Sequence, residues 1–215
     1  MASTSSALVE LRTPELTVGI DPQRGGEITS IERSGHGELL YRLTPQRRDS
    51  PSRRTAAGWL SAYRGGWQFL FPNVGEAGSV AGGDHSFNGD ADNEDWSFER
   101  LGDRQAVGRA TIHGWRVSRS YWLAGVRELV VDTTIENTTT SSLPFLWTEH
   151  PTFLAGDHAT LEFVCSAEPI EGEGGSKAGP VVAAMPDPGQ EQLRCVDVPS
   201  AAVRLRSGGS APDLL

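Results

Sequence analysis

The sequence predicts an all-β protein, an antiparallel β-sandwich made of short strands. Three observations support this prediction: apolar and polar residues alternate over several segments, 25 glycines and 13 prolines interrupt the chain, and no apolar stripe of helical period is sustained. Strands that follow one another without intervening helices pair antiparallel and pack in two layers. The 215 residues, 37% of them hydrophobic, are enough for one sizeable core, so we expect a single domain over residues 1–215.

The clearest strand is "RELVVDTTIEN", residues 127–137, which alternates with a period of two. Its apolar side carries Leu129, Val131, Thr133 and Ile135. The segment before it, residues 115–123, has the same pattern, with Trp115, Val117, Tyr121 and Leu123 on one side. Residues 124–127, "AGVR", suit a hairpin connection, so we expect these two strands to pair antiparallel.

Shorter segments with a similar pattern are separated by Gly, Pro, Asn or Asp, which favour turns. They are residues 8–13, 16–20, 27–32, 67–71, 96–101, 106–113, 159–167, 191–198 and 202–206. Their number and shortness are typical of a sandwich, and long helices are not expected.

The net charge of -9 and pI near 5.0 exclude a nucleic-acid partner, because phosphate contacts require clustered Lys and Arg. No apolar stretch approaches the ~18 residues of a membrane span, and the N-terminus "MASTSSALVEL" lacks the pattern of a signal peptide. We therefore expect a cytoplasmic protein without a membrane partner. The nucleophile elbow, the phosphate-binding loop and the dinucleotide fingerprint are all absent, so no cofactor is expected.

The segment "DHSFNGDADNEDW" is the only stretch with the composition of a metal loop. Asp90, Asp92 and Glu94 have the spacing that opens an EF-hand. However, Asp95 stands where that loop requires its turn glycine, and no glutamate closes the loop. The histidines and cysteines also lack the close spacing of a zinc site. The sequence therefore predicts no metal site.

His150 ends the apolar run "LPFLWTEHPTF", residues 143–153. Pro151 favours an extended backbone at His150 and removes a donor, so the strand must end or bulge there, which can aim the ring into a cleft. Two interpretations stay open at this point: a functional imidazole, or a histidine that satisfies its hydrogen bonds within an aromatic wall. We expect residues 143–147 to be buried strand and Glu149 to point away from His150.

The order of these motifs resembles the aldose 1-epimerase (galactose mutarotase-like) superfamily over about residues 15–165. The motifs are "RGGEITSIERSGHGELLY", "GGWQFLFPN", "HSFNGDADNEDW" and "TIENTTTSSLPFLWTEHPTF". The last one matches best, at Asn137, Leu143, Pro144, Phe145, His150, Pro151 and Phe153.

The resemblance implies a sandwich of large antiparallel sheets whose concave face binds a monosaccharide and interconverts its α and β anomers. His150 would be the general acid that acts on the ring oxygen. Substrate-binding residues would be His85, which hydrogen-bonds the sugar, together with Asn73, Trp96 and Trp147.

The chain also departs from the family pattern. Val74 and Gly75 follow Asn73 where an arginine often grips the sugar, and Ser86 follows His85 where glycine is common. The glutamate that serves as general base near the C-terminus of the family has no counterpart here. We therefore expect a domain that lacks its C-terminal strands and its base, in a chain that is inactive or nearly so.

Two alternatives to an isomerase stay open. The first is a non-catalytic carbohydrate-binding or regulatory module on the same fold. The second is a glycosidase-type pair of carboxylates such as Asp95 and Glu149, which requires a separation of ~5–10 Å across a cleft. The sequence leaves the identity of the sugar and the oligomeric state open.

Overall fold

The computed structural model describes residues 8–43, 54–80 and 83–154, together with the backbone of five short strands between residues 160 and 206. The chain divides into two compact units, Met1–Leu154 and Ala155–Leu215. Each unit is mostly β and is described by itself. The expectation of a single domain over the whole chain stays a prediction.

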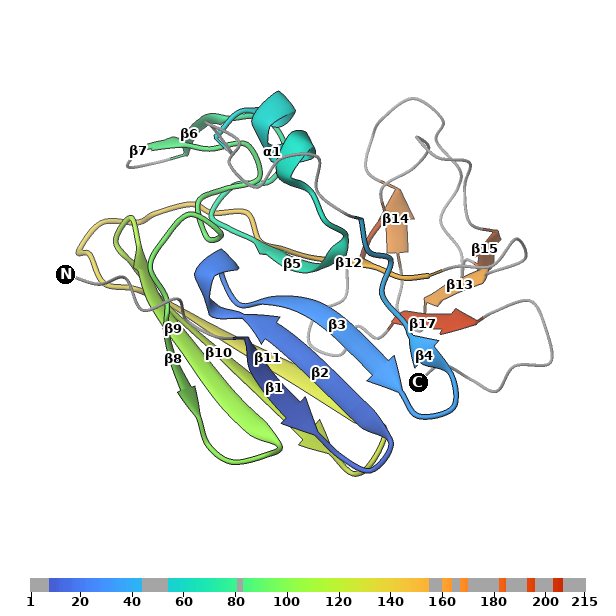
Figure 1. Cartoon of the computed structure of the whole chain (residues 1–215). Helices are drawn as coiled ribbons and strands as arrows, with labels where there is room; N and C mark the ends of the chain where they lie inside the picture. The colour runs from blue at the N-terminus through green and yellow to red at the C-terminus, as the bar shows by residue number, and fades with distance from the viewer. Residues whose placement is uncertain are drawn as a thin grey trace. The chain divides into compact units, whose positions relative to one another are not determined.

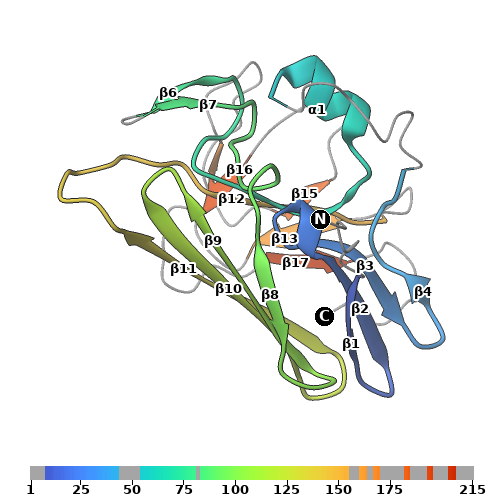
Figure 2. The same ribbon diagram turned by 60° about the vertical axis from the view of Figure 1, so that its left-hand side comes forward.

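The first unit contains two large antiparallel sheets, which Figures 1 and 2 show as separate layers. The first sheet has the order β1-β2-β3-β5-β12, with β4 paired to β3, and the second has the order β11-β10-β9-β8. The strands of the first sheet are β1 (Val9–Arg12), β2 (Leu16–Asp21), β3 (Glu27–Arg33), β4 (Gly37–Glu38), β5 (Gly66–Leu70) and β12 (Thr148–Thr152). Those of the second are β8 (Ser97–Arg100), β9 (Gln105–Ile112), β10 (Trp115–Ala124) and β11 (Glu128–Asn137).

Three smaller elements belong to the first unit. The helix α1 (Ala56–Ala62) lies above β5 in Figure 1, and the hairpin of β6 (Gly78–Val80) and β7 (Gly83–His85) lies toward the same end. A short 3₁₀ turn over Pro22–Arg24 joins β2 to β3. None of the described helices has the length and hydropathy that a bilayer span requires.

The second unit contains two small antiparallel sheets among its described strands. One has the order β15-β13-β17 and the other pairs β14 with β16. The strands are β13 (Thr160–Phe163), β14 (Ala167–Pro169), β15 (Val182–Ala184), β16 (Leu193–Cys195) and β17 (Val203–Arg206).

The hydrophobic core lies between the two sheets of the first unit. Val18 and Ile28 of the first sheet pack in one cluster with Tyr121 and Leu123 of the second. Every second residue of β10 is buried, as its alternation predicts, and β10 pairs with β11 along its full length. The same buried row includes Arg119, a charge that is 0% exposed and must therefore find a partner inside the core.

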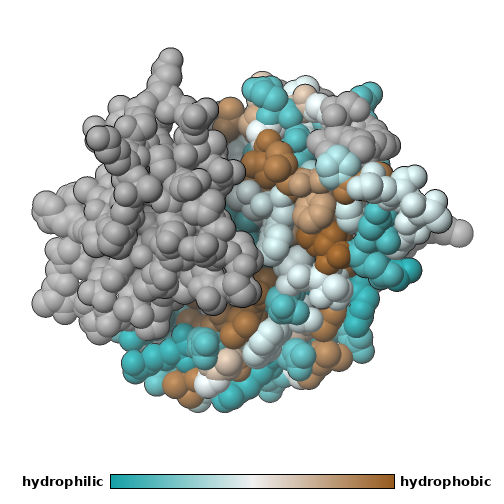
Figure 3. Space-filling view, turned by 180° about the vertical axis from the view of Figure 1, so that it is seen from behind, coloured by the Kyte–Doolittle hydropathy of each residue, from teal (hydrophilic) through white to brown (hydrophobic). Residues whose placement is uncertain are grey.

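Two expectations about local structure are wrong: that residues 143–147 form a buried strand, and that the strand ends or bulges at His150, since β12 pairs regularly with β5 through Pro151 to Thr152. Residues 143–147 are irregular rather than strand, and Phe145, Leu146 and Trp147 are exposed. The reason is topological, because this segment carries the chain from β11 of the second sheet to β12 of the first and so cannot join a ladder. Figure 3 shows that exposed hydrophobic side chains on the face behind that of Figure 1 form several patches separated by hydrophilic ones.

The sequence pattern did not predict the short helix α1. It has seven residues, too few for a 3.6-residue period to stand out. Its N-terminus is nevertheless encoded locally, because the Thr55 side chain accepts a hydrogen bond from the backbone N–H of Gly58, as an N-cap does.

Candidate functional site

The face of the first sheet that carries His150 has buried polar atoms without hydrogen-bond partners, and two of them belong to neighbouring residues. His150 lies on β12 directly opposite Gln68 on β5, so the two side chains leave the sheet on the same face. Within the described residues, neither Nδ1 of His150 nor Oε1 of Gln68 has a hydrogen-bond partner, although solvent reaches neither atom. Buried polar groups are rarely left unpaired, so these two atoms mark a place where a ligand can supply the missing bonds once a side-chain movement gives it access.

Aromatic side chains from α1 and from its C-cap form a wall beside the imidazole. The rings of Trp59 and Tyr63 both lie 6.1 Å from the ring of His150, centroid to centroid, in edge-to-face geometry. Tyr63 is fixed in turn by a hydrogen bond between its hydroxyl and that of Thr152 on β12. The site therefore combines few polar groups with an apolar aromatic wall, the usual make-up of a small-molecule site.

Burial lowers the pKa of His150 below its usual value of 6.5, because the charged imidazolium loses its hydration among these side chains. The ring is therefore neutral near pH 7. One nitrogen of a neutral imidazole carries a proton and the other accepts, so the same side chain can lend a proton or take one.

A buried carboxylate lies elsewhere on the same face. Strand alternation places Glu27 of β3 on the side of the sheet that carries His150, because Ile28 is opposite Trp67 and Trp67 contacts Glu149 on the other side. Glu27 is 2% exposed, and burial raises its pKa even though two arginines oppose that shift. Nε of Arg24 lies 3.1 Å from Glu27 and Nη2 of Arg64 lies 3.8 Å from it.

Glu149 occupies the opposite face of β12, as strand alternation predicts. Its Oε1 is 2.6 Å from Nη1 of Arg119 and its Oε2 is 3.1 Å from Nη2, and Oε2 also accepts a 2.7 Å hydrogen bond from Trp67. The guanidinium lies 4.4 Å from the centre of the Phe69 ring. Glu149 therefore neutralises the buried charge of Arg119 and ties β12 to the second sheet.

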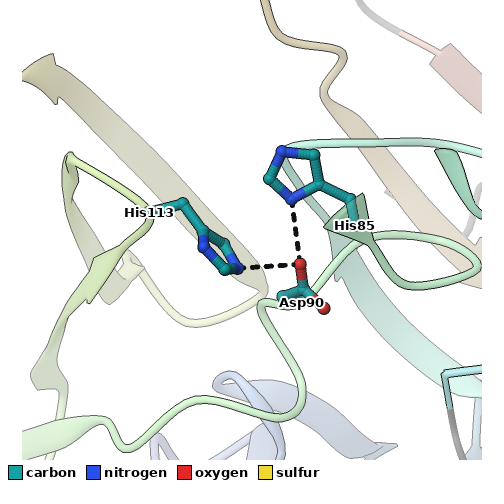
Figure 4. Close-up of side chains that lie close together, drawn as sticks. All are labelled: His85, Asp90 and His113. Carbon is teal, nitrogen blue, oxygen red and sulfur yellow. Dashed lines mark hydrogen bonds and ion pairs between the residues drawn. The ribbon is translucent and has the colours of Figure 1, made fainter. Parts of the chain in front are cut away.

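A second polar cluster combines two histidines with one aspartate (Figure 4). Oδ2 of Asp90 lies 3.0 Å from Nδ1 of His85 and 3.0 Å from Nε2 of His113, so one oxygen faces both rings. The other carboxylate oxygen accepts from the backbone N–H and the hydroxyl of Ser86. Burial raises the pKa of Asp90, but the hydrogen bonds from Ser86 and His85 outweigh it, and the net shift is downward.

Ser86 and Phe87, which lie between His85 and Asp90, connect this cluster to the aromatic side chains beside His150. The ring of Phe87 lies 5.7 Å from that of Trp59, and Nε of Arg54 donates to the hydroxyl of Ser86. Phe87, in the loop between His85 and Asp90, therefore packs against Trp59 of α1, and Trp59 in turn packs against His150. His85 and His150, both predicted site residues, lie on segments that contact this one helix.

The other predicted site residues have local roles in the structure. Asn73 is buried and its amide donates to the carbonyls of Glu76 and Ser86, which holds the loop before β6. The indole N–H of Trp96 donates to the carbonyl of Ala91, and its ring packs against Phe69. Trp147 is 47% exposed, and its indole nitrogen lies 3.4 Å from Glu149.

Sequence reasoning assigned no role in the site to Gln68, Trp59 or Tyr63. Gln68 lies within the motif "GGWQFLFPN", but only the pairing of β5 with β12 brings it to His150. Trp59 belongs to the short helix that the pattern missed, and Tyr63 is the C-cap of that helix. No local signal was available for any of these three.

Comparisons with known proteins identify solved structures that have a similar fold. No protein-family model matches the chain, and no curated protein matches it in sequence. A galactose mutarotase related enzyme from Lactobacillus acidophilus has a similar structure, with a TM-score of 0.67 and 16% identity over 94% of this chain and 74% of its own. A protein from Escherichia coli, named provisionally as an aldose 1-epimerase, gives a TM-score of 0.55 and 17% identity over 86% of this chain and 65% of its own.

A third similar structure is the Slr1438 protein from Synechocystis sp. PCC 6803, with a TM-score of 0.58 and 22% identity over 75% of this chain and 60% of its own. This chain thus spans less than two thirds of the length of two of the three structures. The fold is a mutarotase-like β-sandwich of two antiparallel sheets, and the resemblance found in the sequence is confirmed at the level of the fold.

Proposed function

We propose that the chain binds a monosaccharide on the face of the first sheet that carries His150, as an aldose 1-epimerase-like isomerase of its α and β anomers. The observation that carries the proposal is the pair of unpartnered atoms, Nδ1 of His150 and Oε1 of Gln68, beside the aromatic wall of α1. Sugar hydroxyls both donate and accept, so they satisfy such atoms, while aromatic side chains cover the apolar C–H faces of the ring.

His150 is the proton donor in this proposal. As the bond between the anomeric carbon and the ring oxygen breaks, negative charge grows on that oxygen and His150 protonates it. A base removes the proton of the anomeric hydroxyl, the anomeric carbon becomes a carbonyl, and rotation followed by reclosure gives the other anomer. A neutral imidazole is a weak acid, so the proton moves only as negative charge grows on the ring oxygen. General acid catalysis of this kind raises the reaction rate by ~10²–10⁴-fold.

The carboxylate that accepts the anomeric proton is not assigned. Glu149 lies on the opposite face and binds Arg119, while Glu27 is held by Arg24 and Arg64. This engagement of both carboxylates favours a second candidate function, in which the chain binds the sugar without isomerising it. The glycosidase-type alternative loses support, because Glu149 is committed to a buried ion pair.

His85 is the second sugar contact in this proposal. Asp90 fixes its Nδ1, which leaves Nε2 to bond a hydroxyl. The exposed indole of Trp147 lies beside Glu149, on the face opposite His150, so its predicted role in binding the sugar loses support. The cytoplasmic location also stays a prediction.

Sugar binding and mutarotation are tested separately. Binding of glucose and galactose is measured by ligand-observed NMR for the wild type, His150→Gln and Gln68→Met. Each variant removes about one hydrogen bond to the ligand, so we expect a roughly two- to tenfold weaker affinity. His36→Gln serves as the control, since that histidine lies in an exposed turn.

Polarimetry on freshly dissolved α-glucose then separates the two candidate functions. Catalysed relaxation that His150→Gln reduces by at least about 10²-fold supports the isomerase. Binding without catalysis supports the sugar-binding module. Absence of binding to both sugars, or equal binding by His150→Gln and the wild type, contradicts both candidates.

A further inference from the structure

The cluster of His85, Asp90 and His113 has the chemistry of a transition-metal site, and it shares only His85 with the proposed sugar site. Two imidazoles and one carboxylate come from three separate segments: the end of β7, the loop after it, and the turn between β9 and β10. Their three ligand atoms all lie within 4.8 Å of one another. We propose that these three side chains bind a divalent transition-metal ion of the zinc type.

The spacing of the ligand atoms suits such an ion. Bonds of about 2.0–2.1 Å around a tetrahedral ion place neighbouring ligand atoms about 3.3 Å apart. Both imidazole nitrogens lie 3.0 Å from Oδ2 of Asp90, within a few tenths of an ångström of that value. The two nitrogens, which lie within 4.8 Å of each other, must approach by up to about 1.5 Å to reach that spacing, and His113, whose side chain is 34% exposed, has room to move.

The hydrogen bonds that hold the Asp90 carboxylate resemble those that orient ligands in known metal sites. Ser86 donates its backbone N–H and its hydroxyl to Oδ1, which leaves Oδ2 directed at the two rings. The backbone N–H of Asp90 is fixed as well, by a 2.9 Å hydrogen bond to the carbonyl of Phe71. Partners of this kind orient a ligand before the ion arrives and raise affinity.

The backbone around the cluster is also unusual. In the described part of the chain, the non-glycine residues with positive φ are Asn88 at 61° and His113 at 45°. Asn88 lies in the loop that presents Asp90, and His113 occupies the first position of a two-residue hairpin turn completed by Gly114. Such conformations cost free energy in most residues and gather at functional sites. The left-handed backbone at position 113 places the imidazole at the tip of the hairpin, where it meets Asp90.

The donor set selects the kind of ion. Imidazole nitrogens suit Zn²⁺, Ni²⁺, Co²⁺ and Fe²⁺, whereas Ca²⁺ and Mg²⁺ prefer oxygen ligands in larger number. Three protein ligands leave a fourth position on the ion to a water molecule or another ligand. When Nδ1 of His85 holds the ion, the ring proton resides on Nε2, so the sugar contact proposed above is preserved.

Calorimetric titration of the chelator-treated full chain with ZnCl₂ tests the proposal. We expect one ion per chain with micromolar or tighter affinity, and no binding of Mg²⁺ under the same conditions. His113→Asn and Asp90→Asn are expected to weaken zinc binding by at least about tenfold, and Ser86→Ala by a smaller factor. Asn tolerates the left-handed backbone at position 113, so the first variant keeps the turn.

His36→Asn is the matched control, since it removes an exposed histidine far from the cluster in sequence and is expected to bind zinc like the wild type. Visible absorption of the Co²⁺ complex gives a second readout, with the intensity of four-coordinate cobalt in the wild type and its loss in His113→Asn. Zinc binding that is absent, or equal in the wild type, His113→Asn and Asp90→Asn, overturns the proposal and leaves a hydrogen-bonded triad. No sugar enters either measurement, so the outcome does not depend on the proposed function.

Discussion

Arg119 of the second sheet and Glu149 of the first form a two-point ion pair across the core. The two contacts measure 2.6 and 3.1 Å, and the arginine side chain is fully buried while that of Glu149 is 26% exposed. Glu149 directly precedes His150, so this pair holds the strand that presents the proposed proton donor. A structural contact on one face of β12 thereby sets the position of a functional side chain on the other.

Removal of Glu149 is expected to destabilise the fold strongly. Glu149→Ala leaves Arg119 buried without its counter-charge, and breaking such a pair costs about 3–5 kcal/mol. Because Glu149 is partly exposed, we expect a loss near the lower end, measured as the free energy of unfolding in urea. Glu136→Ala is the matched control, since its pair with Arg116 is exposed and is worth at most about 1 kcal/mol. Equal losses in the two variants would show that the core pair contributes no more than a surface pair.

The stability of the protein is expected to fall with acidification through His150. Its pKa lies below the usual 6.5, so between the lowered value and 6.5 the unfolded chain binds more protons than the folded one. Stability therefore rises with pH across that window and is lost as the pH falls through it. In His150→Gln this contribution is absent, so the advantage of the wild type over the variant should shrink in acid. Urea titrations at several pH values measure the difference, with His36→Gln as control. A difference that grows on acidification would mean that the pKa is raised.

Replacement of Gln68 is expected to separate stability from binding. Gln68→Met keeps the length of the side chain and removes the buried oxygen that has no partner, and an unsatisfied buried group costs about 1–3 kcal/mol. We therefore expect the free energy of unfolding of the unliganded protein to rise by about 1 kcal/mol while sugar affinity falls. Such opposition between stability and binding is common at functional sites. A variant that is less stable than the wild type would assign Gln68 a structural role instead.

Alternation within single segments was enough to predict β10, β11 and their pairing, because a period of two is a local property of the sequence. The same pattern placed position 119 on the buried side of β10 but gave no reason for an arginine there, since its partner lies thirty residues further along the chain. The segment 143–147 was misread because apolar composition does not distinguish a strand from a crossing between sheets. Gln68 and His113 reach their clusters only through tertiary pairing, which no local signal reports.

Asp90→Asn is expected to destabilise the protein at neutral pH and to lose that effect in acid. The carboxylate accepts hydrogen bonds from Ser86 and His85, and these bonds lower its pKa below the usual 3.8 despite burial. A lowered carboxyl pKa contributes stability that is fully present above 3.8 and is lost as the pH falls through the folded value. We expect a cost of about 1–3 kcal/mol near pH 7, measured in urea with chelator present so that no metal contributes. Asp103→Asn is the control, because its carboxylate is exposed and pairs with Arg100 at the surface. A cost for Asp90→Asn that stays unchanged as the pH falls progressively below 3.8 would trace it to the shape of the side chain, since the contribution of the charge declines over that range.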